Sequence, residues 1–310
     1  MNKIYTHPGQ PEMQVEVILA SKGPDQAPLY TIRMRYPRII HGEIMTHRVF
    51  SRNARSSRAV PVKTMLNEVR NTPFIPWHWG KNQKGMQADE ECREPIKLGN
   101  LFGNVGIEPE NAWLHFAHGA ADHAEAMMNA GYHKQIPNRL LEPFSWIDTL
   151  ITSCDWNNFL WLRDHKDAEP HLQDLARLVK QAIEEAEIQE LQPGQWHTPY
   201  ITDDDVDHAM DISDTRDDFN AWICKISAAR CARISYKPFD GDSSYEAELR
   251  RYDQLVTSDR VHASPTEHQA TPDTQVSNLI DSVWKHSELH GNLPGWIQSR
   301  KLIPGENHSG

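Results

Sequence analysis

The sequence predicts an α/β fold in which a mixed sheet is flanked by long helices. Residues 14–20 and 29–36 alternate apolar and polar side chains, which is typical of β-strands. Residues 112–131 and 167–188 instead repeat apolar side chains at helical spacing. We therefore expect one domain that spans residues 1–310.

The amino-terminal part is expected to begin with a β-hairpin, because the turn-forming sequence SKGPDQAP separates the two alternating stretches. After Pro37 the periodicity changes, and residues 38–50 place apolar side chains at near-helical spacing. This helix would carry His47 and Arg48 towards its carboxyl end and the loop beyond. Residues 62–112 are rich in Pro, Gly, Trp and Lys with weak periodicity, so we expect an irregular insertion there.

The later elements follow the same reasoning. The helix at 112–131 should end at Gly131, since glycine commonly follows the last helical residue. Residues 144–163 (FSWIDTLITSCDWNNFLWLR) are long and apolar enough to cross a core. The final hundred residues supply a strand-like run at 231–236 (CARISY), a helix-like run at 243–258 and the segment HASPTEHQATP.

Composition limits the class of ligand. The 310 residues carry a formal net charge of -11, which argues against tight binding to a nucleic-acid polymer or a membrane surface. The amino terminus has no apolar core of a signal peptide, and no stretch is apolar enough to span a membrane. We expect a cytoplasmic protein that binds small molecules.

Two other patterns favour structural roles over metal binding. The four cysteines show no C-x-x-C spacing, so buried free thiols are expected rather than a zinc or redox site; they are Cys92, Cys154, Cys224 and Cys231. Residues 201–218 hold eight Asp without the glycine-centred spacing of a calcium loop. This stretch predicts a solvated acidic surface, and no metal is expected.

A cationic segment stands out in this acidic chain. MTHRVFSRNARSSRAVP (45–61) contains five Arg or His residues. Its arginines offer planar forks to phosphate oxygens and its serines add short hydroxyl donors, which suits a phosphate monoester or a pyrophosphate. The alternative is a solvated basic turn that pairs with acids elsewhere. The Rossmann, P-loop, zinc-protease and serine-hydrolase motifs are absent from the sequence.

The spacing in this segment resembles the motif of the flavin-dependent thymidylate synthases, R-H-R-x-x-S-x-N-E-x-S-x-R-Y. The matching residues are His47, Arg48, Ser51, Asn53, Ser56 and Arg58. The chain departs from the motif at Thr46, Ala54 and Ala59.

Two further stretches resemble the same family. AGYHKQIPNRLLEP (130–143) places Arg139 where the family has a nucleotide-phosphate-binding Arg. NNFLWLRDHKDAEPHLQDLA (157–176) places Arg163 on the pyrimidine-contacting Arg, and Glu169 where a flavin-contacting Gln is usual. Either Arg is also explained as a structural residue whose stem covers apolar surface.

The order of the motifs appears rotated relative to the family, as in a circular permutation. Family members begin with a strand, a helix and H-x-[ST]-P-x-E-H, all ahead of the arginine-rich motif. Here AARCARISY and HASPTEH lie within residues 227–270, behind it. Such rotation is tolerated where termini lie close together. The alternative is that His262, Glu267 and His268 form a surface cluster or half of a metal site.

The resemblance implies methylation at C5 of a deoxypyrimidine monophosphate, dUMP to dTMP. FAD would be the cofactor, with methylenetetrahydrofolate and NADPH as co-substrates, in a homotetramer with sites between subunits. Arg163 would be catalytic by polarising the pyrimidine. The substrate-binding residues implied are Glu43, Ser56, Ser57, Arg58, Arg139 and Arg163. The cofactor-binding residues implied are His47, Arg48, Val49, Ser51, Asn53, Asn158, Glu169, His262 and Ser264.

Other functions stay open. Glu43 replaces a Gln that is common in the family, and an added acceptor would suit the amine of cytosine, which gives a dCMP methylase or hydroxymethylase as the second hypothesis. Because three motif positions are altered, a non-catalytic nucleotide- or flavin-binding relative is the third. A histidine-rich metalloenzyme is the fourth. Glu306 in the tail is a candidate to replace the carboxylate missing at Ala54.

Overall fold

The computed structural model describes residues 2–97, 99, 105–234, 242–256, 261–277 and 282–307. Its main sheet has six strands in the order β1-β2-β3-β7-β4, with β8 beside β2. The pairs are antiparallel except for β2 with β8, so the sheet is mixed and the α/β fold class is confirmed. The strands are Ile4–His7 (β1), Gln10–Lys22 (β2), Leu29–Pro37 (β3), Ser51–Ala54 (β4), Trp146–Ser153 (β7) and Gln189–Glu190 (β8).

The predicted hairpin is confirmed as β2 and β3. Their register sets Val17 opposite Ile32 and Val15 opposite Met34. β3 then pairs along its length with β7, which is the first half of the apolar stretch expected to cross the core. β4 pairs with the other side of β7, so it lies at the edge of the sheet.

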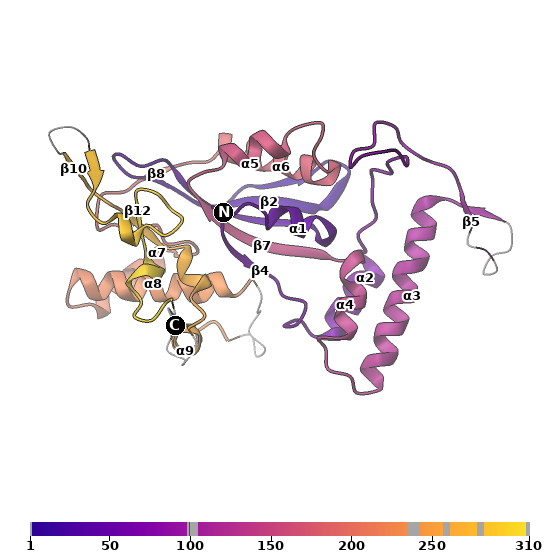
Figure 1. Ribbon diagram of the computed structural model, residues 1–310. Helices are drawn as coiled ribbons and strands as arrows, with labels where there is room; N and C mark the ends of the chain where they lie inside the picture. Colours follow the sequence, from indigo (N-terminus) through magenta and orange to yellow (C-terminus); the bar gives the residue numbers. More distant parts are fainter. Residues whose placement is uncertain are drawn as a thin grey trace.

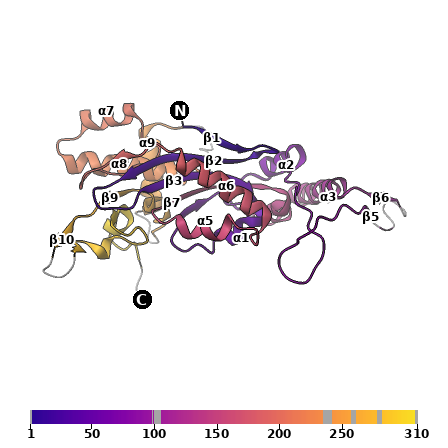
Figure 2. The ribbon, with the colours of Figure 1, turned by 90° about the horizontal axis from the view of Figure 1, so that it is seen from above.

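The two faces of the sheet differ in chemistry, because side chains alternate between faces along each strand. One face is apolar and includes Ile32, Met34 and Ile151. Helices α5 (Asn157–Arg163) and α6 (Pro170–Glu184) cover it (Figures 1 and 2). The opposite face is mostly polar, and its strand residues include Ser21, Thr31, Arg33, Ser51, Asn53, Asp148 and Thr152.

The structure of helix α6 contains the sequence signals from which this helix was predicted. Pro170 occupies its first turn, and the carboxylate of Glu169 caps it by accepting from the Leu172 backbone N–H at 2.8 Å. Leu172, Leu175 and Val179 recur at helical spacing and are buried in the core with the sheet.

A second hydrophobic cluster lies at one end of the sheet, where α2, α3 and α4 meet (Figure 1). Helix α3 (Pro109–Asn129) confirms the helix predicted at 112–131, and Gly131 beyond it has a φ of 87°. Helix α4 is Pro137–Leu141 and is followed by the 3-10 turn η3 (Glu142–Phe144).

The expectation of an irregular insertion over 62–112 is wrong at both of its ends. Helix α2 spans Val62–Asn71, and α3 begins at Pro109. Val62, Met65 and Val69 are buried at helical spacing, a short pattern that the Pro, Gly and Trp content of the remaining stretch obscured. Between these helices the described residues form little regular structure, chiefly the short pair β5 (Ile96–Lys97) and β6 (Gly106–Ile107).

The carboxyl-terminal third lies at the opposite end of the sheet from α2, α3 and α4 (Figures 1 and 2). Its helices are α7 (Asp203–Ile212), α8 (Arg216–Ala232) and α9 (Tyr245–Val256). The 3-10 turns η4 (Ser264–Glu267), η5 (Ser287–Leu289) and η6 (Ser299–Leu302) follow. Four short strands form two antiparallel pairs here: β9 (Ala270–Pro272) with β12 (Trp296–Gln298), and β10 (Gln275–Ser277) with β11 (Ser282–Trp284).

The strand expected at 231–236 is wrong where it can be checked. Cys231 and Ala232 complete α8, because good helix formers such as Ala228 and Ala229 extend that helix without a stop signal. Residues 235 and 236 lie outside the described ranges. The helix expected at 243–258 is confirmed by α9 over its described residues.

The acidic stretch 201–218 lies largely on α7 and the start of α8, and most of its carboxylates are exposed. Asp205 is the exception: it is buried and forms a bidentate pair with Arg230. No group of three His, Cys, Asp or Glu side chains suited to a metal ion occurs among the described residues. Within the same residues, no helix has both the length and the hydropathy that a membrane crossing requires.

Candidate functional site

Arg163 and the turn after α1 bring several predicted residues together. The turn follows η1 (Arg38–Ile40) and the short helix α1 (His41–Ile44), so His47 lies just beyond a helix end, as expected. Arg163, the last residue of α5, donates from Nε to His47 Nε2 at 3.1 Å and from Nη2 to Thr46 Oγ1 at 3.1 Å. We call Glu43, Thr46, His47, Arg52 and Arg163 the His47 cluster.

His47 is a neutral hydrogen-bond acceptor in this cluster. Its ring is buried against Phe50 and Phe159. Burial, together with the smaller effects of the cations Arg163 and Arg52, lowers the pKa of His47 to about 4. Since Nε2 accepts from Arg163, the ring proton of His47 is on Nδ1.

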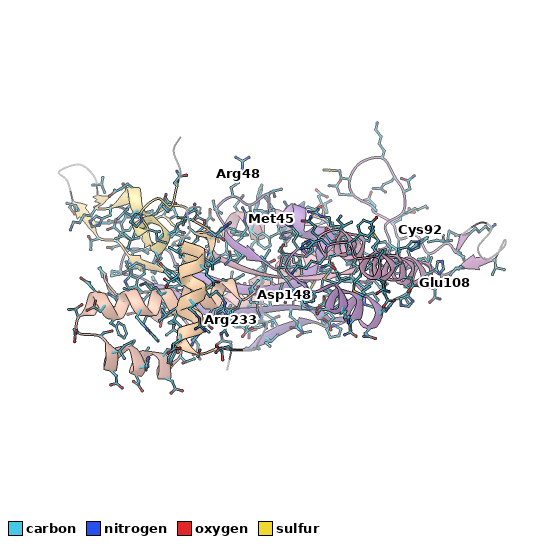
Figure 3. All side chains as sticks on the ribbon, turned by 90° about the horizontal axis from the view of Figure 1, so that it is seen from below. Met45, Arg48, Cys92, Glu108, Asp148 and Arg233 are labelled. Carbon is cyan, nitrogen blue, oxygen red and sulfur yellow. The ribbon has the colours of Figure 1, made fainter. Side chains whose placement is uncertain are left out.

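The cluster holds more positive than negative charge. Arg52 donates to the carbonyl oxygens of Met45 and His47, at 2.8 and 3.2 Å. Within the described ranges, neither Arg52 nor Arg163 has a carboxylate within ion-pairing distance. Arg48 and Val49 are exposed on the same turn, and Figure 3 shows Arg48 projecting outwards near Met45.

Strand β4 divides the motif between the two faces of the sheet. Ser51 and Asn53 are buried and point to the polar face, away from Arg52. Ser51 Oγ donates to Asn292 Oδ1 at 3.1 Å and accepts from Gln298 Nε2 at 3.3 Å. The Asn53 amide donates to the Cys231 carbonyl at 3.4 Å.

The end of the motif meets α4 in a second group, which joins the predicted Ser56, Ser57, Arg58 and Arg139 to three residues that were not predicted. We call it the Ser57 cluster: Arg38, Ser56, Ser57, Arg58, Asn138, Arg139 and Glu142. Asn138 is fully buried and donates to the carbonyl oxygens of Ser57 and Val60, at 2.7 and 2.9 Å. This bond joins the loop that bears Ser56 and Arg58 to the helix that bears Arg139.

Glu142 limits what Ser57 can do. Ser57 Oγ donates to Glu142 Oε1 at 2.5 Å, and Arg38 forms an ion pair with the same carboxylate at 3.2 Å. Burial lowers the pKa of Arg38, and the nearby Arg55 and Arg139 add to this effect while Glu142 opposes it. Ser57 is thus already satisfied, whereas Ser56 is half-buried beside it.

The arginines of the segment fall into two classes. Arg55 is neutralised by a bidentate pair with Glu68 at 2.7 and 3.0 Å. Arg48, Arg58 and Arg139 are exposed and have no ion pair in the part of the chain that the structure describes. With Arg163, they are cations left for an external anion.

The other predicted residues are placed as follows. Asn158 is exposed in the first turn of α5. Glu169 uses one carboxylate oxygen to cap α6 and the other to bind His171 Nδ1 at 2.6 Å. His262 and Ser264 are exposed at η4, which contacts β4 from the polar face. No hydrogen bond between described residues joins them to the His47 cluster.

The tail lies against η4. Arg300 pairs with Glu267 and with Glu306, and Lys301 binds Glu306 at 2.6 Å. Gln298 also donates to the Glu267 carbonyl at 3.0 Å. Glu306 therefore neutralises tail cations of its own, which leaves its suggested role as a substitute for Ala54 without support.

Sequence reasoning missed several residues that shape these clusters: Arg38, Asn138, Glu142, Asn292 and Gln298. Asn138 and Glu142 flank the predicted Arg139, so their proximity to it was the available signal. Asn292 and Gln298 reach Ser51 across more than 240 residues, and no local pattern marks them.

A cavity of about 650 Å³ lies elsewhere, between α7, α8 and the edge strand β8, and no predicted site residue lines it. The candidate site is instead an open surface. It can bind a ligand through the arginines that have no carboxylate partner among the described residues. Its guanidinium groups suit phosphate oxygens.

No protein-family model and no curated protein matches the chain. Among solved structures, flavin-dependent thymidylate synthase ThyX from Helicobacter pylori, complexed with FAD and dUMP, matches 51% of this chain and 68% of its own, at 16% identity and a TM-score of 0.33. The UMP/dUMP methylase PolB from Streptomyces cacaoi, bound with 5-Br UMP, matches 50% and 68%, at 16% identity and a TM-score of 0.34. With 5-Br dUMP, it matches 52% and 67%, at 18% identity and a TM-score of 0.34.

The resemblance found in the motifs therefore recurs among the structural neighbours. At these TM-scores the likeness assigns no residue role and no activity to this chain.

Proposed function

We propose that this protein is a flavin-dependent enzyme that methylates C5 of a deoxypyrimidine monophosphate, converting dUMP to dTMP. Methylenetetrahydrofolate would be the carbon donor and NADPH the reductant. One observation carries the proposal: in a chain with a net charge of -11, Arg48, Arg58, Arg139 and Arg163 have no carboxylate partner among the residues that the structure describes. These cations need external anions, and a nucleotide phosphate and a flavin pyrophosphate supply them.

The residues expected to bind FAD lie on both sides of the edge strand β4, and the His47 cluster would bind its pyrophosphate end. Arg48 is exposed and has no ion pair among the described residues, as a pyrophosphate-binding arginine requires. His47 offers a neutral ring beside it, with the Nδ1 proton as a donor. When bound, FAD would supply the redox chemistry that the side chains of the protein cannot.

Arg163 is the residue we assign to pyrimidine activation. A guanidinium stays charged at all relevant pH values, so it stabilises negative charge that develops on the O2/N3/O4 system of the base. His47 and Thr46 hold its Nε and Nη2 groups, which fixes the plane of the fork. Arg58, Arg139 and Ser56 would bind the 5′-phosphate, while Glu142 keeps Ser57 and Arg38 in place.

The test is a titration of the purified protein, reconstituted with FAD, with dUMP and with deoxyuridine. A shift of the flavin spectrum with dUMP, followed by dTMP formation with methylenetetrahydrofolate and NADPH, supports the proposal. Arg58→Gln and Arg139→Gln should each weaken dUMP binding at least tenfold, since each removes a charged hydrogen bond to phosphate. They should leave binding of deoxyuridine, which lacks the phosphate, unchanged.

Arg70→Gln is the matched control, because Arg70 is also a surface arginine but pairs with Asp122 and Glu125 on α3. It should bind dUMP like the wild type. A protein that takes up no FAD, or whose affinity for dUMP is the same in all three variants, contradicts the proposal. FAD and nucleotide binding without turnover would instead favour a non-catalytic relative.

A second candidate substrate, dCMP, is favoured by Glu43. Its half-buried carboxylate has no ion pair among the described residues, and its carbonyl oxygen lies 3.5 Å from Arg163 Nη2. A free acceptor at this place suits the exocyclic amine of the cytosine in dCMP. The uracil of dUMP has no such amine. Turnover on dCMP but not dUMP, reversed by Glu43→Gln, would establish this alternative.

We also expect a homo-oligomer, with a tetramer as the expected state. Met45, Val49 and Leu162 are partly exposed around the His47 cluster, and Trp161 is 75% exposed. Such apolar exposure next to a binding site is typical of a surface that another subunit covers. Light scattering on wild type and Trp161→Glu measures this: the variant should dissociate, and a monomeric wild type contradicts it.

A further inference from the structure

Five fully buried side chains form a hydrogen-bonded relay across the polar face of the sheet: Ser21, His197, Thr31, Thr152 and His268. His197 Nδ1 lies 2.7 Å from Ser21 Oγ, and its Nε2 lies 2.8 Å from Thr31 Oγ1. Thr31 is directly opposite Thr152 on the neighbouring strand, and their hydroxyl oxygens are 2.6 Å apart. Thr152 Oγ1 in turn lies 2.8 Å from His268 Nδ1.

The direction of the relay follows if every hydroxyl proton in it has an acceptor. Ser21 Oγ accepts from the Gln189 amide at 2.9 Å, and among the described residues the contact with His197 Nδ1 gives the Ser21 proton its acceptor. A neutral His197 then carries its proton on Nε2 and donates it to Thr31. Thr31 donates to Thr152, and Thr152 donates to His268 Nδ1. His268 must therefore carry its own proton on Nε2.

This Nε2–H is the unsatisfied end of the relay. His268 Nε2 is closed to solvent and has no hydrogen-bond partner within the described ranges. A buried N–H without an acceptor costs free energy, so such a group calls for an explanation.

The position of His268 links it to the candidate site. It directly follows η4, the turn that bears Ser264, and η4 contacts β4. Ser51 of β4 is the cross-strand neighbour of Thr152 and points to the same face. The His268 ring therefore lies in the region where the cofactor-binding residues expected on this face, Ser51 and Ser264, converge.

We propose that His268 is a further ligand-binding residue, fixed by the relay as the Nε2–H tautomer, which donates to a ring carbonyl or ring nitrogen of the flavin bound against η4. This rests on the proposed function, which supplies the flavin. Ser21, Thr31, Thr152 and His197 are then positioning residues, since they act only through His268. The small movement of η4 that admits the acceptor would relieve the unsatisfied N–H.

The first measurement is the tautomer of His268 in the FAD-free protein, by long-range nitrogen-15 NMR of histidine-labelled wild type. The expected result is a protonated Nε2 and an unprotonated Nδ1. A proton on Nδ1 would overturn the relay. Addition of FAD should then shift the His268 Nε2 resonance, and an unchanged resonance with FAD bound would refute contact with the flavin.

The second measurement compares two isosteric variants of one strand. Thr152→Val breaks the relay. Thr149→Val removes an equally buried hydroxyl from the other face of β7, where it lies 2.8 Å from Tyr36 Oη. We expect Thr152→Val to lose the fixed tautomer and to bind FAD about tenfold more weakly, the effect of one misaligned hydrogen bond. Thr149→Val should keep both properties, and Thr152→Ser should restore them.

The outcomes separate this inference from the proposed function. If the wild type binds no FAD at all, the proposed function fails and the flavin contact fails with it, while the NMR result still decides the relay. If FAD binds but Thr152→Val binds it as tightly as Thr149→Val does, the role of His268 is refuted and the proposed function stands.

Discussion

Acidification from pH 7 to pH 5 should destabilise the folded protein, because the fold buries His197 and His268 as neutral rings. Burial lowers the pKa of each to about 3, with a smaller contribution from His268 to the lowering of the pKa of His197. In the unfolded chain both return to about 6.5. Between these values only the unfolded state binds the extra protons, so their contribution to stability is complete above pH 6.5 and is lost as the pH falls towards 3.

The size of the effect follows from the two pKa values. Each pH unit below the unfolded pKa of about 6.5 costs about 1.4 kcal/mol per histidine, so each loses about 2 kcal/mol at pH 5. The pair loses about 4 kcal/mol, a large share of the roughly 5–15 kcal/mol by which proteins are stable. Asp205 and Asp273, whose pKa values are lowered, add little here because carboxylates in the unfolded chain also ionise below pH 5.

Urea denaturation at pH 7 and pH 5 measures the loss. His197→Gln should be less stable than the wild type at pH 7 but should lose about 2 kcal/mol less than the wild type between pH 7 and pH 5, since one protonation is removed. The rest of the dependence remains, because burial also lowers the pKa values of His268, His41 and His47. His123→Gln, on the exposed side of α3, is the control and should keep the dependence of the wild type. If His197→Gln loses as much unfolding free energy between pH 7 and pH 5 as the wild type does, the reasoning is wrong.

Three further predictions concern single side chains. Arg163→Gln should raise the pKa of His47 from about 4 to a value that stays below 6.5, because burial is the larger cause of the lowering. An NMR titration of His47 measures this pKa, and the control Arg177→Gln should leave it unchanged. Asp205→Asn should lower the free energy of unfolding, measured by urea denaturation, by about 3 kcal/mol, because Arg230 loses its buried partner. The control Asp204→Asn, at an exposed position, should change this free energy by less than about 0.5 kcal/mol. Gly131→Ala should cost about 1 kcal/mol, since φ is 87° and no atom crowds the added methyl group; a neutral effect in thermal denaturation would contradict this.

The elements predicted correctly are those whose pattern is long and local. Residues 14–20 and 29–36 alternate because one face of the hairpin meets the core, and the α6 residues repeat at helical spacing for the same reason. The stretch 62–71 failed because its short apolar pattern stands beside an irregular region. The strand expected at 231–236 failed because its short run was considered alone, while the preceding Ala228 and Ala229 favour a helix that continues through Ala232.

The candidate site could be predicted in part only. The motifs supplied residues that the structure brings together in two places. Arg163 contacts His47, and Asn138 joins the loop of Ser57 to the helix that bears Arg139. The ligand-binding roles of these residues stay predictions. The Ser51 contacts with Asn292 and Gln298 could not be predicted, and neither could the relay, because only the pairing of distant strands and the position of the tail bring these residues together.

The uneven faces of the sheet bear on how the chain folds during synthesis. By residue 190 the ribosome has delivered every strand of the main sheet and the helix α6 that closes its apolar face. The face that awaits the remaining third is mostly polar, although it includes Leu29 and Leu150. That third brings His197, His268 and Gln298, and it also brings Leu293 and Trp296, which pack against Leu29. We expect the nascent intermediate to tolerate this delay, because a mostly polar face recruits other chains less than an exposed apolar face would.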